Sequence, residues 1–285
     1  MNFSKQARIR FKQFNILEKL ITINVIFFVF PFLLKTAFYL FNISITNWFD
    51  FVELSANVSK TISRPWTILS YGFFHGSFGH IFWNMVLLNL SGLLMLNLFK
   101  KNLLINTYFI GIIAGGLIYI ISYNIFPVFN SVNASLIGSS AGVMAVLVFM
   151  ASYMPNSPIR VFVFSVPLKY IALLFIFIDL IQIPQSNAGG HIAHLGGALW
   201  GYIYQRQYLK GNDIGYWFLK TYDGFRMILK SKKQYPQYKK RDNAKKQTKS
   251  IDQKKVDTIL DKIADSGYES LTKSEKEYLF KAGND

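Results

Sequence analysis

The sequence has no cysteine and only four histidines among its 285 residues. The absence of cysteine excludes disulfide bonds, thiolate catalysis and zinc sites built on cysteine. Acidic residues are also few, because 15 Asp and Glu stand against 31 Lys and Arg and leave a formal net charge of +16. In a soluble protein this charge would suggest a nucleic-acid partner. Here the basic residues flank long apolar segments, so they indicate membrane topology instead and predict no nucleic-acid binding.

Long apolar segments dominate the chain, and 52% of its residues are hydrophobic. About 20 predominantly apolar residues suffice to cross a bilayer. The candidate spans are 17–41, 77–99, 103–126, 134–154, 159–182 and 190–206. The first span is too long for a signal peptide and lacks a small-residue cleavage site. The sequence therefore predicts an all-α polytopic membrane protein with six transmembrane helices.

Basic residues alternate along the short connections. Lys100 and Lys101 lie between the second and third spans, Arg160 lies between the fourth and fifth, and Arg206 and Lys210 follow the sixth. The short connections 127–133 and 183–189 contain neither Lys nor Arg. Because basic connections stay in the cytoplasm, this alternation predicts that both termini are cytoplasmic.

The composition divides the chain into four parts. They are an N-terminal cytoplasmic segment (1–16), the membrane domain (17–210), a basic juxtamembrane linker (211–255) and a small cytoplasmic module (256–285). The linker is dense in Lys and Arg, which is typical of a solvated segment and favours contact with anionic lipid. In the module, apolar residues at helical spacing and a capping box from Thr272 to Glu275 predict two helices.

The few polar residues of the membrane domain gather at one depth. The histidines are His75, His80, His191 and His194, and all lie at the outer ends of the second and sixth spans. Asn84 follows His80 by one helical turn on the same face. From a rise of about 1.5 Å per residue, Ser140 lies roughly 10 Å and His194 roughly 6 Å below the outer surface. A single serine in a membrane helix usually supports helix packing, and a single histidine near the interface is usually structural. The common depth of these residues favours a functional site instead.

Small residues allow the fourth and sixth spans to approach each other. Gly138 and Gly142 flank Ser140, while Gly197 and Gly201 form a GxxxG pattern one turn after the last histidine. Such patterns let helix backbones pack closely. Close packing would bring a serine hydroxyl and an imidazole within hydrogen-bond distance.

Three segments resemble the motifs of the rhomboid intramembrane serine proteases. They are RPWTILSYGFFHGSFGHIFWNM (64–85), GSSAG (138–142) and AHLGGALWG (193–201). The motifs occur in the family's order, and the resemblance covers about residues 60–205. It implies a six-helix rhomboid bundle without a cofactor or metal. It also implies a serine endopeptidase of the bacterial inner membrane that cleaves transmembrane proteins near the outer face. The C-terminal module resembles tails of some bacterial members.

The resemblance also implies a role for each motif residue. Ser140 would be the nucleophile and His194 the general base, in a dyad without the usual aspartate. His80 and Asn84 would donate to the oxyanion together with the backbone N–H of Ser140, and His75 would be structural. The motif glycines near the site are Gly138, Gly142, Gly197 and Gly201.

Some positions depart from the family pattern or fall outside it. Met144 stands where many members carry a tyrosine that packs against the base, so the sequence leaves open how the base is held. Trp66 is followed by Thr67, where a Trp-Arg pair is common. Ser139 lies about 100° around a helix from the nucleophile and is interpreted as a spacer. His191 is either a second polar neighbour of the site or an interfacial residue, and the second interpretation is favoured.

Two other functions remain open on the sequence. A metalloprotease could use His80, His191 and His194 as zinc ligands, but no HExxH is present. Asp179, near the outer end of the fifth span, has no partner pattern. The second alternative is a catalytically inactive rhomboid-like protein that binds transmembrane partners, although such proteins typically lack the Ser or the His. The expected partners are transmembrane substrates and the lipid bilayer, and the sequence does not predict an oligomeric state.

Overall fold

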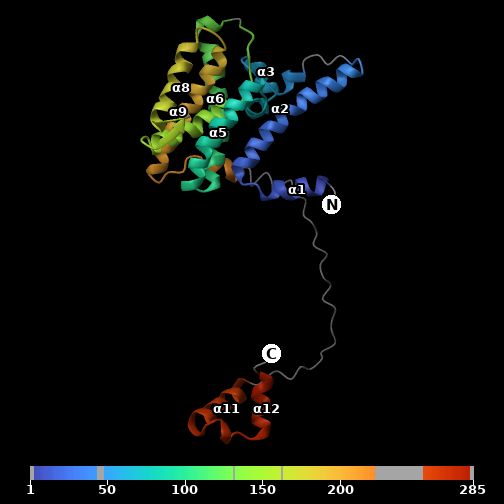
Figure 1. The fold of residues 1–285 in the computed structure, drawn as a ribbon, viewed down its shortest axis with the longest axis vertical. Helices are drawn as coiled ribbons and strands as arrows, with labels where there is room; N and C mark the ends of the chain where they lie inside the picture. The colour runs from blue at the N-terminus through green and yellow to red at the C-terminus, as the bar shows by residue number, and fades with distance from the viewer. Residues whose placement is uncertain (1–2, 44–47, 131, 162, 222–252, 283–285) are drawn as a thin grey trace. The chain divides into compact units, whose positions relative to one another are not determined.

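A computed structural model gives the structure of the chain and describes residues 3–43, 48–130, 132–161, 163–221 and 253–282. The chain divides into two compact units, Met1–Leu229 and Lys230–Asp285. Figure 1 shows that helices dominate both units. Most of the linker predicted at 211–255 falls on residues 222–252, which lie outside the described residues.

The first unit contains helices of very different lengths. They are α1 (Phe3–Gln13), α2 (Ile16–Leu40), α3 (Val58–Ser63), α4 (Thr67–Ser70), α5 (Phe78–Leu98), α6 (Lys101–Ile125), α7 (Ser140–Tyr153), α8 (Leu168–Gln182) and α9 (Ala188–Leu209). Among the described residues, α2, α5 and α6 are long and apolar enough to cross a membrane. The apolar helix α7 has only 14 residues, and α8 has 15. The structure therefore supports three crossings by helix length, and six crossings stay a prediction.

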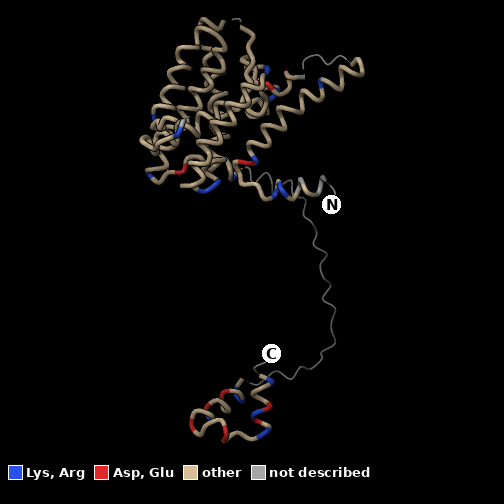
Figure 2. The backbone as a smooth tube through the Cα atoms, viewed as in Figure 1, with Lys and Arg blue, Asp and Glu red and all other residues tan. Residues whose placement is uncertain are grey.

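Charged residues of the first unit gather toward the ends of its long helices, as Figure 2 shows. Local sequence sets where two of these helices start. Asn15 and Glu18 form a capping box at the start of α2, with each side chain accepting from the backbone N–H of the other. Ser77 caps α5 by accepting from the backbone N–H of His80 at 3.2 Å. This cap satisfies a free N–H group of the first turn and places His80 there.

In the fourth predicted span, the helix begins later in the sequence than hydropathy predicts. Residues 134–154 are predicted as one span, but α7 starts at Ser140. Before it, β2 (Ser135–Leu136) is extended, and Gly138 has a φ of 127°. A helix cannot continue through that backbone conformation. The prediction that Ser140 lies inside a helix that starts near residue 134 is therefore wrong, because Ser140 is the first residue of α7.

The fifth predicted span, 159–182, also starts too early. Its first part forms a hairpin of β3 (Pro158–Val161) and β4 (Phe164–Pro167), and α8 follows. Alternating β-branched and aromatic residues favour this extended pairing. A proline fits the last strand position because the next residue begins the helix.

A second short sheet ties two distant segments together before α7. β1 (Leu54–Ser55) pairs antiparallel with β2, with Leu54 opposite Leu136 and both side chains buried. This unit also contains the 3₁₀ helices η1 (Trp48–Phe51), η2 (Tyr71–Phe73) and η3 (Pro127–Phe129). The pairing anchors the chain four residues before Ser140.

The helix α7 lies at the centre of the first unit. Every residue from Ala141 to Ala151 is buried, and α5, α6, α8 and α9 all pack against α7. A Cβ on Gly197 would lie 2.7 Å from the carbonyl carbon of Ala141, and one on Gly201 would lie 2.9 Å from that of Ala145. Only glycine allows backbones to approach this closely. The structure thus brings the fourth and sixth predicted spans together at the motif glycines.

The second unit consists of α11 (Gln253–Ser266), η4 (Tyr268–Ser270) and α12 (Lys273–Ala282). The predicted capping box is present, because the Thr272 N–H donates to Glu275 at 2.7 Å and the Glu275 N–H donates to the Thr272 hydroxyl at 3.4 Å. Lys262 of α11 pairs with Glu275 at 3.1 Å. Hydrogen bonds from Thr272 and then Lys262 lower the pKa of Glu275 to about 2.

Candidate active site

Ser140 stands at the point where an extended segment turns into α7. The N–H of Gly138 donates to the carbonyl of Tyr71 at 2.9 Å, which holds the turn. A Cβ on Gly138 would lie 2.7 Å from the ring Cε1 of His80, so glycine lets that ring approach the backbone beside the serine. The first N–H groups of a helix have no intrahelical acceptor. The backbone N–H of Ser140 therefore lies at the positive end of α7.

His194 faces Ser140 from the second turn of α9. Its Nε2 lies 2.6 Å from the Ser140 hydroxyl oxygen, and its side chain is 21% exposed. The two residues are 54 positions apart in the chain. A hydroxyl and an imidazole at this distance form the arrangement in which histidine can take a proton from serine.

Asp179 of α8 joins this pair, although the sequence assigned it no partner. Its Oδ1 lies 2.8 Å from the Nδ1 of His194 and 2.8 Å from the Nδ1 of His191. It is the only buried Asp, Glu, Lys or Arg in the described part of the chain. The interpretation of Asp179 as a residue without a partner is therefore wrong. A carboxylate in an otherwise apolar span was the available signal.

Of the two interpretations of His191, its contact with Asp179 supports a second polar neighbour of the site. Its ring turns into the bundle toward Asp179, and its side chain is 16% exposed. His191 and His194 are three residues apart, so they share one face of α9. Their spacing was visible in the sequence, but the position of α8 opposite that face was not.

His80 and Asn84 line a cavity of about 320 Å³ together with Ser140 and His194. The amide nitrogen of Asn84 donates to the backbone carbonyl of His80 at 3.0 Å. An amide has a second N–H, which leaves one donor of Asn84 for a ligand. Met144 lies one turn after Ser140 and contributes an apolar wall to the same cavity. The cavity thus combines apolar walls with polar groups around the serine hydroxyl.

The two adjacent serines have different neighbours. Ser139 is fully buried, and its hydroxyl lies 3.1 Å from the Nε2 of His75, which is itself 3% exposed. The ring of His75 packs edge-on against that of His80, with 5.1 Å between centroids. Ser139 is therefore more than a spacer, because it holds the histidine behind His80. The sequence offered no signal for this contact beyond the presence of both residues.

Asp179, His191 and His194 form a group whose ligand atoms lie within 4.8 Å of one another. The zinc alternative drawn from the sequence used His80 in place of Asp179, and His80 does not belong to this group. Two histidine nitrogens and a carboxylate can bind zinc. In the structure both histidine Nδ1 atoms are already hydrogen-bonded to Oδ1 of Asp179.

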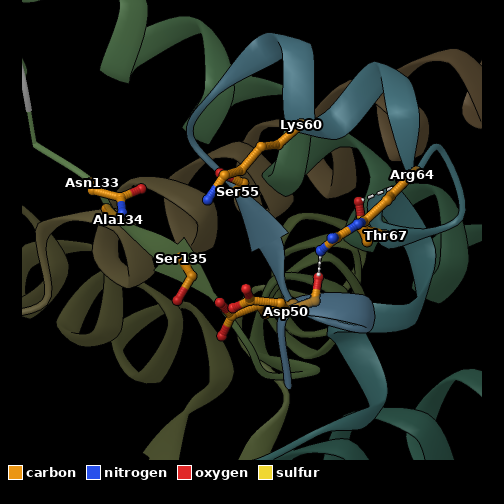
Figure 3. A pocket seen from close by; sticks show the side chains of 9 residues that line it. Asp50, Ser55, Lys60, Arg64, Thr67, Asn133, Ala134 and Ser135 are labelled. Atoms are coloured by element: carbon orange, nitrogen blue, oxygen red, sulfur yellow. Dashed lines mark hydrogen bonds between the residues drawn. The ribbon is translucent and has the colours of Figure 1, made fainter. Parts of the chain in front are cut away.

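A second, polar cavity of about 200 Å³ lies between α3 and the segment that contains β2. Figure 3 shows Lys60, Arg64 and Asp50 around it, and Arg64 donates to the Asp50 carbonyl at 2.6 Å. Burial raises the pKa of Glu53, which also lines this cavity. No histidine is among the described residues that line it, so these residues do not supply the serine–histidine pair that meets in the first cavity.

The fold and the first cavity define a helical membrane protein with a serine and a histidine at hydrogen-bond distance. The rhomboid domain family matches residues 63–211, and the chain belongs to the rhomboid family. A family of unknown function (DUF6576) matches residues 241–281. The comparison with curated proteins gives no match. The chain is therefore an integral membrane protein from a family of intramembrane proteases.

Proposed function

We propose that the protein is a serine endopeptidase that cleaves transmembrane proteins near the outer face of the membrane. The observation that carries this proposal is the 2.6 Å distance between the Ser140 hydroxyl and Nε2 of His194. Both groups line a cavity with the two further motif residues His80 and Asn84. A protein that only bound its partners would not need a base so close to a serine.

The reaction would proceed through an acyl-enzyme. The Ser140 oxygen attacks the carbonyl carbon of the scissile peptide bond while His194 Nε2 takes the hydroxyl proton. The resulting tetrahedral intermediate collapses when His194 returns that proton to the leaving amine. Water then repeats the sequence on the ester, and Ser140 regains its proton when the new carboxyl end departs.

The tetrahedral intermediate carries a negative oxygen that needs fixed donors. The backbone N–H of Ser140 is one, since it has no intrahelical acceptor at the start of α7. His80 and the second N–H of Asn84 supply the others from the same cavity. Removing one donor of this kind lowers turnover by about 100- to 1,000-fold in serine proteases. We expect His80→Ala and Asn84→Ala to fall in that range.

The proposed orientation follows from the basic connections of the chain. Arg160 and Lys210 lie near the ends of α7 and α9 that are remote from Ser140 and His194. Basic residues favour the cytoplasmic side, so the catalytic pair would open toward the outer face of a bacterial inner membrane. Both termini would then be cytoplasmic. Substrates should carry small or helix-destabilising residues at the cut, because a helical backbone has its carbonyls engaged.

The test is cleavage of a model transmembrane substrate by purified protein in detergent. Ser140→Ala and His194→Ala should each abolish cleavage. Ser139→Ala removes an adjacent hydroxyl of the same kind and should leave most of the activity, at reduced stability, because it contacts only His75 of the histidines in the described chain. If Ser139→Ala were inactive and Ser140→Ala active, the assignment of the nucleophile would be wrong.

Two further outcomes separate the alternatives. The group of Asp179, His191 and His194 favours a metalloprotease as the second candidate. In that case a chelator would abolish cleavage and zinc would restore it, whereas the serine mechanism predicts activity that a chelator leaves intact. An inactive binding protein would retain its transmembrane partner without producing fragments in any variant.

A further inference from the structure

We infer that Asp179 is a positioning residue for the catalytic base, and that His191 holds its carboxylate in place. The inference rests on the proposed function and completes a chain of side chains that runs Ser140, His194, Asp179 and His191. All three links are hydrogen bonds of 2.6 to 2.8 Å. The serine and the carboxylate occupy opposite nitrogens of the His194 ring.

The carboxylate decides which nitrogen of His194 carries the proton. An ionised carboxylate only accepts hydrogen bonds, so the Nδ1 of His194 must be the donor in the 2.8 Å contact. A neutral imidazole has one N–H, and its other nitrogen is then an acceptor. Nε2 therefore presents a lone pair to the Ser140 hydroxyl. When that proton arrives, the adjacent carboxylate stabilises the positive ring.

The location of Asp179 is costly unless the carboxylate is used. Its side chain is 6% exposed in the helix segment LKYIALLFIFIDLIQ, where all other residues but one lysine and one glutamine are apolar or tyrosine. Its second oxygen, Oδ2, is buried without a hydrogen-bond partner among the described residues. Buried carboxylates destabilise a protein unless they are paired. An apolar residue would suit packing better, so the carboxylate is explained by the His194 contact.

His191 gives the carboxylate a second anchor. Its Nδ1 reaches the same Oδ1 at 2.8 Å from the preceding turn of α9. Two donors from one helix face restrict the rotation of the Asp179 side chain, which alone could turn Oδ1 away from His194. His191 therefore acts on the base only through Asp179. Its loss should lower kcat less than the loss of Asp179 does.

The test compares kcat and KM of Asp179→Asn with the wild-type protein on the transmembrane substrate. Asparagine keeps the shape, but its N–H₂ can donate to Nδ1 and favour the ring form with its proton on Nε2, facing the serine. In soluble serine proteases this change lowers kcat about 10,000-fold. We expect a loss in kcat on the order of 100-fold here, with KM within about twofold, since hydrogen bonds to charged groups contribute roughly 10- to 150-fold. Asp213→Asn changes another hydrogen-bonded carboxylate, at the far end of α9, and should leave kcat unchanged.

His191 supplies a second comparison that does not alter the carboxylate. His191→Ala should lower kcat several-fold, and His191→Asn should restore most of it because the Asn amide nitrogen takes the place of Nδ1. A fluorophosphonate reacts covalently with an activated serine. The final amount of label gives the number of folded sites, and the rate of labelling reports how strongly Ser140 is activated. The rate should fall in Asp179→Asn in parallel with kcat, even if fewer molecules fold.

The outcomes separate this inference from the proposed function. If Ser140→Ala is inactive while Asp179→Asn keeps kcat and the labelling rate within twofold per folded site, Asp179 is only structural and the inference is wrong. If Ser140→Ala still cleaves, the proposed function itself fails. Equal kcat values for His191→Ala and His191→Asn would show that His191 does not hold the Asp179 carboxylate in place for catalysis.

Discussion

The contact between α7 and α9 can be perturbed with a single methyl group at Gly197. A Cβ there would lie 2.7 Å from the carbonyl carbon of Ala141, whereas ordinary contacts begin near 3.4 Å. The Ala141 carbonyl oxygen would lie closer still, so the helices would have to separate by about 1 Å or more, and Ala141 is next to Ser140. The 2.6 Å link to His194 would then approach or pass the limit of a hydrogen bond.

A displacement near 1 Å at a reacting centre costs about 100-fold in rate, and overpacking costs about 1–3 kcal/mol in stability. We therefore expect Gly197→Ala to remain folded with kcat reduced about 100-fold. The assay measures kcat in detergent alongside thermal unfolding of the same preparation.

Two other glycines supply controls for this prediction. Gly201→Ala meets the Ala145 backbone in a similar way, but two helical turns from His194. It should cost similar stability and less activity. Gly76→Ala places its Cβ 3.6 Å from Ile137, an ordinary contact, and should change neither. The reasoning is refuted if folded Gly197→Ala keeps kcat within twofold of wild type, or if Gly201→Ala loses as much activity as Gly197→Ala.

Two further predictions concern stability. Asn24, fully buried on α2, donates to the Tyr108 hydroxyl of α6 at 3.0 Å, so Asn24→Ala should cost about 1 kcal/mol and lower the thermal midpoint in detergent; an unchanged midpoint would contradict this. The pKa of Glu275 is lowered to about 2 by Thr272 and then Lys262, so its stabilisation of α12 is present above its ordinary pKa and lost as pH falls toward 2. Amide exchange of α12 in the full chain should accelerate over that range, and Glu275→Gln should abolish the pH dependence.

The residues of the candidate site differ in how far the sequence could predict them. Ser140 and His194 were predicted because motif spacing and small residues act locally: glycines one turn apart make a helix face that can approach another helix. Asp179 was missed because it lies on a different helix from both histidines. Which face of α8 meets α9 depends on the rotation of both helices, and hydropathy carries no information about rotation.

The start of α7 was missed for a different reason. Hydropathy depends only on residue type and carries no information about backbone conformation. The apolar run 134–154 was therefore predicted as one helix. The pairing of β2 with β1 and the positive φ of Gly138 prevent a helix before Ser140, so α7 begins there. This difference matters chemically, because it places the serine N–H at a helix end, where it has no intrahelical acceptor.

By itself the sequence determined the class of the protein and predicted which serine and which histidine form its candidate site. Long apolar runs, sparse charges and spaced small residues are properties of local segments, and they persist whatever the packing. The tertiary structure decided what surrounds those two residues: Asp179 and His191 behind the base, and His75 behind Ser139. These contacts join residues from separate helices or loops, and only the packed arrangement of those elements brings their side chains within hydrogen-bond distance.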